Sequence, residues 1–521
     1  MSMYTHIARS NRLNNAGGCY PDAMEHATTF TILMIKLNKE NKKDRLVMTI
    51  ITLFLWLTQQ WASIKSYKDI PNFTRISGTF NCQPFTFRTF TRGNNSWVEY
   101  AHEVKDNQHT YYVWQPIPRY LNCIFQPYFS DLRYNIPLLT DRVKQRLFKL
   151  INSHWKTPLV LKAFKPARKN TFYRYISLCA RADETLTPIP RKHLVKSVKA
   201  HHTSAICYQR FSSDRLRFKI FDAHNRYIGF LFEFIRKENL HSYFKVHLES
   251  KTVNLITERL RDTPYENIDP NLKHKGSMSQ YKIIKTKGKS DHVAVPAIML
   301  GSRRVPKDKD VTDFFNRIDN YVKQLKPNNR ASRAQWLAYF NAVSFRIALL
   351  FIVLTGVRPT HSISLLSHYF SFTHITFVKD KGRLRQVILS DYLLKEITHY
   401  TELKASLHSQ LSLHDDLPEL WYIYDNSETP TPLSARALRV FMNKHWAGVV
   451  PYQLRHYFAQ CAHTIISLTP LTAQDVDRLM GHENTGEHLG SDIMFPKNIG
   501  VLKAYLNGLD QHIGVKELHY V

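Results

Sequence analysis

Two arginines stand in a pattern that suits phosphate chemistry. Arg358 closes the stretch 354–358 (LTGVR), and Arg455 lies well downstream in the run 452–456 (YQLRH). A histidine, His482, follows a glycine later in the chain. Arginine keeps its charge and presents a planar fork of donors that can grip two oxygens of a phosphate at once. Two such forks, with ring donors beside them, can neutralise the transition state of phosphodiester transfer without a metal ion.

Each of these side chains needs an element that aims it. The apolar run before Arg358 predicts a helix that delivers this residue at its end. On a following helix Tyr452 and Arg455 stand three residues apart and share a face, so both side chains can reach one phosphate. Gly481 at a helix end permits the left-handed turn that aims His482.

A β-hairpin is expected between the two arginines. Alternating β-branched residues at 372–378 and 385–389 flank a turn that contains glycine. Lys381 lies in this turn, and Lys379 precedes it. A lysine in such a turn is also common for solubility alone, so the hairpin by itself assigns no role.

Taken together, T-G-x-R, the L-R-H of 454–456 and the L-M-G-H of 479–482 resemble the tyrosine recombinase (phage integrase) family over roughly residues 311–515. The resemblance implies a mainly α fold with a small antiparallel β-sheet. In this fold a recombinase-like catalytic domain follows a helical core-binding domain and an α+β N-terminal region.

The resemblance also implies roles for the individual residues. Arg358 and Arg455 would hold the phosphate, Tyr452 and His482 would donate to it, and Lys381 would protonate the departing 5′ oxygen. Lys379 is the alternative proton source. The sequence departs from the family at Tyr452, where histidine is commonest, and in lacking an acidic residue soon after Arg358.

The nucleophile is the departure with the largest consequence. In the family a tyrosine usually stands nine or ten residues after the late histidine, where this chain has Ser491 and Asp492. Tyr505 is the first tyrosine after that histidine, and Tyr520 is the penultimate residue. We predict Tyr505 as the nucleophile, although its helical spacing with leucines suits a core aromatic equally well.

Charge and composition indicate a polyanion as partner. The net charge of +30 and the pI near 9.8 favour nucleic acid, because Lys and Arg that neutralise phosphates release counterions. A basic linker is expected at 272–309, where ten Lys/Arg face two Asp. The predicted DNA contacts beyond the hairpin are Lys285, Lys287, Lys289, Arg303 and Arg304. A solvated charge run is the alternative interpretation of this segment.

Cofactors and metals are not indicated. The six cysteines are scattered without CxxC spacing, and the 26 histidines form no HExxH pattern. We therefore expect no metal, no cofactor and a reducing compartment. The apolar run 46–57 is too short to span a bilayer and predicts a buried helix, with no membrane contact.

Four segments are expected along the chain. A poorly ordered segment covers 1–45, an accessory domain of unknown role 46–200, a core DNA-binding region 201–330, and the catalytic domain 331–521. The run 216–221 is read as strand-like, and helices are expected near 311–325, 333–354 and 434–446.

The leading hypothesis is a site-specific DNA recombinase or integrase that acts through a 3′-phosphotyrosyl intermediate. Its partners would be double-stranded DNA and further copies of itself. It would be cytoplasmic and nucleoid-associated, or nuclear in a eukaryotic host. One alternative is a recombinase-fold protein that binds DNA without cleaving it. Another is an RNA-associated basic protein whose motifs match by chance, for which Arg358 would lie far from Arg455.

Overall fold

The computed structural model describes residues 22–77, 82–92, 95–105, 110–195, 208–244, 280–286, 289–295, 299–328, 330–360, 363–380, 382–413, 417–464, 471–481 and 496–520. It divides into two compact units. Unit 1 contains Met1–Asp183, Ile189–Lys199 and Phe211–Leu300, and unit 2 contains Glu184–Pro188, Ala200–Arg210 and Gly301–Val521. The chain passes between the units at 199–200, next to an expected boundary, whereas the boundary expected at 330 lies inside unit 2.

The reason for this division is a sheet built from distant strands. Unit 1 holds a six-stranded sheet in the order β1-β2-β3-β4-β6-β7, in which only the β1–β2 pair is parallel. Strand β4 pairs with β6, with Tyr112 opposite Tyr281, and so draws the 280–295 segment into unit 1. The strands are β1 (Thr74–Arg75), β2 (Thr86–Arg92), β3 (Asn95–Lys105), β4 (Thr110–Pro116), β6 (Gln280–Thr286) and β7 (Lys289–Val295).

This sheet corrects the prediction of a linker at 272–309. Residues 280–295 form the β6–β7 hairpin, because alternating apolar and polar residues can pair as strands even in a basic segment. The short strands β5 (Arg210–Ser212) and β8 (Met299–Gly301) pair with each other.

The helices of unit 1 correct two further expectations. α2 (Ala23–Asn38) starts at Asp22, whose side chain accepts a hydrogen bond from the backbone of Glu25, so much of the 1–45 segment is ordered helix. Residues 1–21 lie outside the described residues. The run 216–221 lies inside α10 (Ser213–Lys237) rather than in a strand. Its buried apolar residues continue at helical spacing through Ile235, and this longer pattern decides the element.

The apolar run 46–57 is a buried helix, as predicted. It forms most of α3 (Lys42–Leu57), whose residues from Met48 onward are all buried. The remaining helices of unit 1 are α4 (Arg119–Phe129), α5 (Asp141–Asn152), α6 (Lys169–Phe172), α7 (Tyr175–Ala182) and α8 (Pro188–Leu194).

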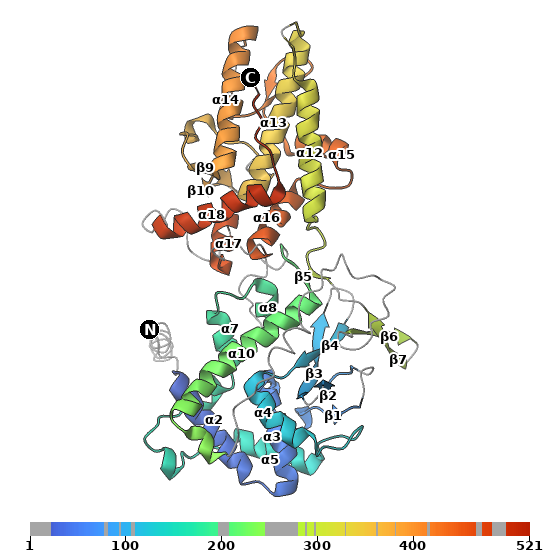
Figure 1. Cartoon of the computed structure of the whole chain (residues 1–521), viewed down its shortest axis with the longest axis vertical. Coiled ribbons are helices and arrows are strands. Elements are labelled where there is room, and N and C mark those ends of the chain that lie inside the picture. Colours follow the sequence, from blue (N-terminus) through green and yellow to red (C-terminus); the bar gives the residue numbers. More distant parts are fainter. Residues whose placement is uncertain are drawn as a thin grey trace, which may run out of the picture. The chain divides into compact units, whose positions relative to one another are not determined.

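Unit 2 is mostly helical (Figure 1). Its helices are α12 (Asp308–Leu325), α13 (Arg333–Thr355), α14 (Asp391–Leu411), α15 (Ala435–His445), α16 (Tyr452–Thr464), α17 (Ala473–Met480) and α18 (Pro496–Ile513). The predicted hairpin is confirmed as β9 (Ile375–Asp380) and β10 (Arg383–Ile388). A second pair joins β11 (Ile423–Tyr424) to β12 (Pro430–Thr431). The three predicted helices are confirmed within a few residues of their expected ends.

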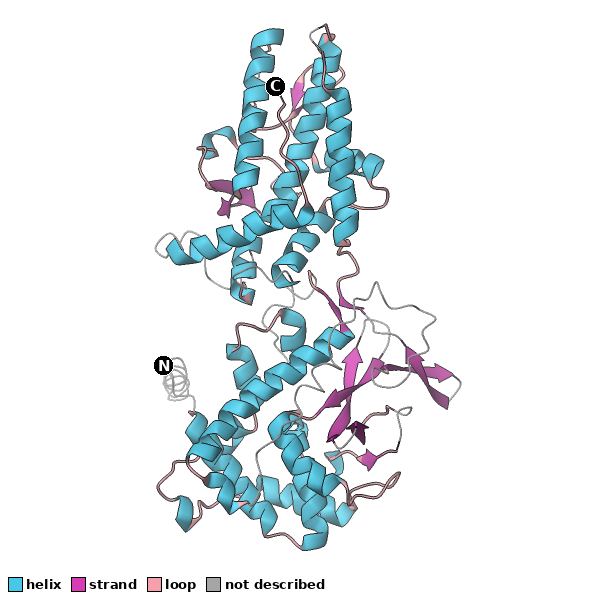
Figure 2. Ribbon diagram, in the orientation of Figure 1, coloured by secondary structure: helices cyan, strands magenta, loops and turns pink. Residues whose placement is uncertain are grey.

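Helix α13 forms the centre of unit 2. It contacts α12, α14, α16 and α18, and most of its residues are buried. By length and composition it could cross a membrane, but 83% of its apolar window is buried inside the unit. A capping box at Ser332 and Gln335 starts it, and Gly356 ends it. The described chain as a whole is mainly helical with small sheets, as Figure 2 shows.

A buried ion network fixes the middle of α13. The guanidinium of Arg346 donates to Asp319 at 2.7 Å, to Glu396 at 2.5 Å and to the backbone oxygen of Lys516 at 2.7 Å. It also donates to the hydroxyls of Tyr520 at 2.6 Å and Tyr392 at 3.0 Å. Ion pairs of Arg346 with two carboxylates therefore join helices α12, α13 and α14, and its bond to Lys516 adds the C-terminal segment.

Candidate functional site

Arg358 is placed by a helix end that only glycine can form. Gly356 caps α13 in the left-handed conformation with φ 66°. A Cβ at this position would lie 2.4 Å from the ring of Phe458 in α16. The close packing of α13 against α16 therefore brings Arg358, two residues later, toward the second arginine.

Arg455 joins the predicted motifs into one site. It is fully buried on α16, and its guanidinium donates to the backbone oxygens of Gly356 and, at 2.8 Å, of Met480. It therefore contacts both the end of α13 and the end of α17, which the sequence separates widely. Burial, followed by the nearby charge of Arg358, lowers the pKa of Arg455.

A third arginine, which the sequence analysis missed, completes the cluster. Arg385 lies on β10 and donates to the backbone oxygen of Leu479 at 3.1 Å. Burial and then the charge of Arg455 lower the pKa of Arg385 to about 9. Gly481 allows this approach, because a Cβ there would lie only 2.0 Å from the Arg385 Nη1. We call Arg358, Arg385 and Arg455 the arginine cluster.

Asp380 is the acid that pairs with the cluster. Its carboxylate accepts from Arg358 at 2.5 Å and lies 3.7 Å from Arg385. Its other oxygen, Oδ1, is buried with no hydrogen bond to the described residues. Within that part of the chain, Nε of Arg455 and both Nε and Nη1 of Arg385 are also buried without hydrogen-bond partners. Three positive charges and one negative charge leave a net positive, incompletely bonded site.

Two tyrosines border the cluster. The Tyr452 hydroxyl lies 2.8 Å from that of Tyr208, and the Arg455 guanidinium lies 5.5 Å from the centre of the Tyr208 ring. Burial, followed by the hydrogen bond with Tyr208, raises the pKa of Tyr452. Tyr452 therefore lies near Arg455 and Arg358, and its predicted role as a phosphate donor stays a prediction. Tyr208 was missed because it lies 244 residues away from Tyr452 in sequence and belongs to no motif.

A basic turn follows β8 beside α16. Ser302 contacts Nδ1 of His456 at 3.2 Å, and His456 directly follows Arg455. Arg303 and Arg304, predicted as DNA contacts, are exposed in this turn. Lys379 is exposed on β9, one residue before Asp380.

The other predicted DNA contacts fall elsewhere. Lys285 and Lys289 lie on β6 and β7 in unit 1, so they do not belong to the unit that holds the arginine cluster. Lys287, Lys381 and His482 lie outside the described residues. Their predicted roles are therefore neither supported nor contradicted.

In the described part of the chain, neither tyrosine predicted as nucleophile, Tyr505 or Tyr520, bonds to the arginine cluster. Tyr505 is only 2% exposed, and its hydroxyl donates to the backbone oxygen of Phe458 at 3.0 Å. Burial raises the pKa of Tyr505 well above its usual value. Tyr520 is also buried, and its hydroxyl donates to Glu396. In this conformation both phenols are core groups, because leucines of α18 and the Arg346 network enclose them.

No family model, no curated protein and no solved structure matches this chain.

Proposed function

We propose that unit 2 is a tyrosine-recombinase-like DNA-binding unit that grips one backbone phosphate in the arginine cluster. The observation that carries the proposal is that Arg358 and Arg385 share the carboxylate of Asp380 while Arg455 lies close enough to both for their charges to interact. Buried donors without partners are costly, and an entering anion would supply acceptors for them. The proximity of Arg358 to Arg455 also disfavours the chance-match alternative, which expects them far apart.

DNA suits this site better than a small anion does. A phosphodiester carries one negative charge with two non-bridging oxygens, which suit the forked donors of the cluster and reduce its excess positive charge. The exposed Arg303–Arg304 turn beside α16 offers contacts to neighbouring phosphates. The net charge of +30 adds the counterion release that drives binding to a duplex.

Strand cleavage is the second candidate function. Tyr505 bonds to the carbonyl of Phe458, which lies on α16 only three residues after Arg455. A shift of α18 that breaks this bond would bring the phenol toward the cluster. The phenol oxygen would then attack the phosphorus and form a 3′-phosphotyrosyl bond, while the 5′ oxygen would leave and take up a proton. Such a reaction requires paired protomers on paired sites.

Fluorescence anisotropy on a labelled duplex tests the phosphate site. Arg385→Gln should weaken binding about tenfold or more, since hydrogen bonds to charged groups contribute about 1.5–3 kcal/mol. Arg439→Gln on α15 is the matched control, because it removes the same charge from an exposed position. Equal losses in the two variants would contradict the site, and tighter binding to duplex RNA than to DNA would favour the RNA alternative.

Covalent trapping on nicked duplexes from the ends of the encoding element separates binding from cleavage. Wild type, Tyr505→Phe and Arg455→Ala are compared on a denaturing gel. A shifted band that both variants lose would establish Tyr505 as the nucleophile. A band that Tyr505→Phe retains would place the nucleophile elsewhere. If wild type binds the duplex tightly but gives no shifted band, the protein binds DNA without cleaving it.

A further inference from the structure

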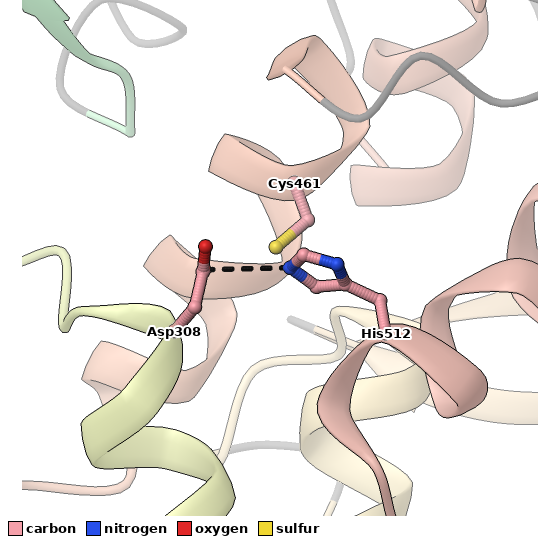
Figure 3. Close-up of side chains that lie close together, drawn as sticks. All are labelled: Asp308, Cys461 and His512. Atoms are coloured by element: carbon pink, nitrogen blue, oxygen red, sulfur yellow. Dashed lines mark ion pairs between the residues drawn. The ribbon is translucent and has the colours of Figure 1, made fainter. Parts of the chain in front are cut away.

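Three potential metal ligands converge from three helices of unit 2. Asp308 begins α12, Cys461 lies in α16, and His512 lies near the end of α18. Figure 3 shows the thiol and the imidazole turned toward the Asp308 carboxylate. One ligand atom from each residue lies within 4.8 Å of the other two. No motif spacing in the sequence indicated this group.

Two of these three potential ligands are spaced almost as in a tetrahedral metal site. The Asp308 oxygen lies 3.5 Å from Nε2 of His512. Zinc bonds of about 2.0–2.1 Å to nitrogen and oxygen place two tetrahedral ligands about 3.3 Å apart. A charge-assisted hydrogen bond is shorter, at about 2.7–2.9 Å. The observed pair is therefore closer to a ligand pair than to a tight ion pair.

The surroundings provide one buried ligand and one open side. Cys461 is 2% exposed, whereas the Asp308 and His512 side chains are 66% and 34% exposed. The buried Tyr457 hydroxyl lies beside Cys461 and Asp308. The exposure of the Asp308 and His512 side chains suits a bound ion that takes water as its fourth ligand.

We propose that Asp308, Cys461 and His512 bind a divalent transition metal of the zinc class. Thiolate and imidazole ligands select zinc over calcium or magnesium, which prefer oxygen. As the metal–sulfur bond forms, the thiol releases its proton to solvent, so binding strengthens as pH rises. The ion would tie α12, α16 and α18 together and hold the helix that carries Arg455. This proposal does not depend on DNA binding.

A second group of potential ligands provides an internal comparison. His399, Glu517 and His519 also bring their ligand atoms within 4.8 Å of one another. Glu517 and His519 are exposed, and the group contains no thiol. Only the Cys461 group can therefore give a sulfur-to-metal signal.

Cobalt titration of the full-length, chelator-treated chain tests the site. We expect one Co²⁺ per chain to produce a sulfur-to-cobalt charge-transfer band in the near ultraviolet, which Zn²⁺ abolishes by displacement. Cys461→Ser should lose the band, and His512→Asn should weaken Co²⁺ binding at least tenfold. Cys179→Ser is the matched control, since Cys179 is a free cysteine of unit 1.

Two results would overturn the metal site. One is the absence of a charge-transfer band in wild type at saturating Co²⁺, even if the ion binds elsewhere. The other is a band that Cys461→Ser retains. Because Cys461 is buried, circular dichroism must show that this variant is folded. If it is not folded, the less buried His512→Asn decides the question through its Co²⁺ affinity.

Discussion

Arg346 and the arginine cluster both lie in unit 2 but have opposite surroundings. Arg346 uses all three guanidinium nitrogens on two carboxylates, two phenols and a backbone oxygen. Although burial opposes its charge, Tyr520 and Glu396 raise the pKa of Arg346 well above its usual value. In the arginine cluster, by contrast, Arg358 and Arg385 share the carboxylate of Asp380 and Arg455 bonds to backbone oxygens, and the pKa values of Arg385 and Arg455 are lowered.

This difference separates an arginine whose donors are all bonded within the chain from a cluster whose unbonded donors are available to the proposed phosphate ligand. A buried charge is tolerated when it is paired and fully hydrogen-bonded. Arg346 meets this condition within the chain, whereas the cluster keeps excess positive charge and unbonded donors among the described residues. Four predictions test whether the difference is functional.

The largest expected effect is on folding. Arg346→Met should lower the free energy of unfolding by about 3–5 kcal/mol, because it leaves the carboxylates of Asp319 and Glu396 buried without their partner. Urea unfolding followed by circular dichroism measures the change. Arg333→Met is the control, since Arg333 forms an exposed ion pair with Glu428 that contributes at most about 1 kcal/mol. If Arg346→Met lowers the free energy of unfolding by less than about 1 kcal/mol, the contrast between Arg346 and the arginine cluster does not hold.

Loss of an arginine from the cluster should act on binding instead. Arg358→Ala should weaken duplex binding by about 1.5–3 kcal/mol, roughly 10- to 150-fold. The free energy of unfolding should fall by less than in Arg346→Met, because Asp380 keeps Arg385 as a neighbour and the repulsion among the arginines decreases. Anisotropy and urea unfolding are measured on the same preparation. Destabilisation as large as that of Arg346→Met would make the cluster structural.

Of two tyrosine substitutions, one should mainly lower stability and the other should mainly weaken duplex binding. Tyr520→Phe should lower the free energy of unfolding by about 1–3 kcal/mol, because it removes a buried hydroxyl from the Arg346 network. Tyr452→Phe should leave stability nearly unchanged and weaken duplex binding by about 0.5–1.5 kcal/mol, since it removes one donor beside the cluster. The reverse outcome would show that Tyr452 supports the fold rather than the ligand.

The smallest effect is a pH dependence above neutrality. With its pKa lowered to about 9, Arg385 loses its proton in the folded chain while the unfolded chain still binds it. Stability from this group should therefore rise with pH above about 9. Duplex affinity should fall up to about tenfold between about pH 8 and 10. Arg385→Gln should bind the duplex more weakly, and its affinity should change less with pH. If the affinities of wild type and variant change with pH in parallel, Arg385 does not titrate in this range.

Local signals in the sequence predicted much of unit 2. The hairpin of β9 and β10 and the left-handed Gly481 were expected and are confirmed, and the Ser434 cap of α15 and the left-handed Gly356 are local features of the same kind. Each depends on the chemistry of a few adjacent residues, such as a side-chain cap or a positive φ. Such signals do not depend on which other elements pack against the helix or hairpin.

Other features were beyond local reasoning. Arg385 and Tyr208 have no motif of their own, and they join Arg455 only because β10 and the segment before β5 pack near α16. Residues 280–295 were read as linker because their pairing partner, β4, lies far upstream. Asp308, Cys461 and His512 likewise meet only when three helices pack together.

The sequence alone determined the approximate ends of three helices of unit 2, near 311–325, 333–354 and 434–446, and singled out Arg358 and Arg455 as a pair of phosphate ligands. Periodicity and capping act over one or two turns, so they can be read from neighbouring residues. The tertiary structure alone decided that Arg385 joins them and that Tyr505 is enclosed in the core. Solvent exclusion and charge balance depend on all the elements that pack around a group, and no local pattern records that packing.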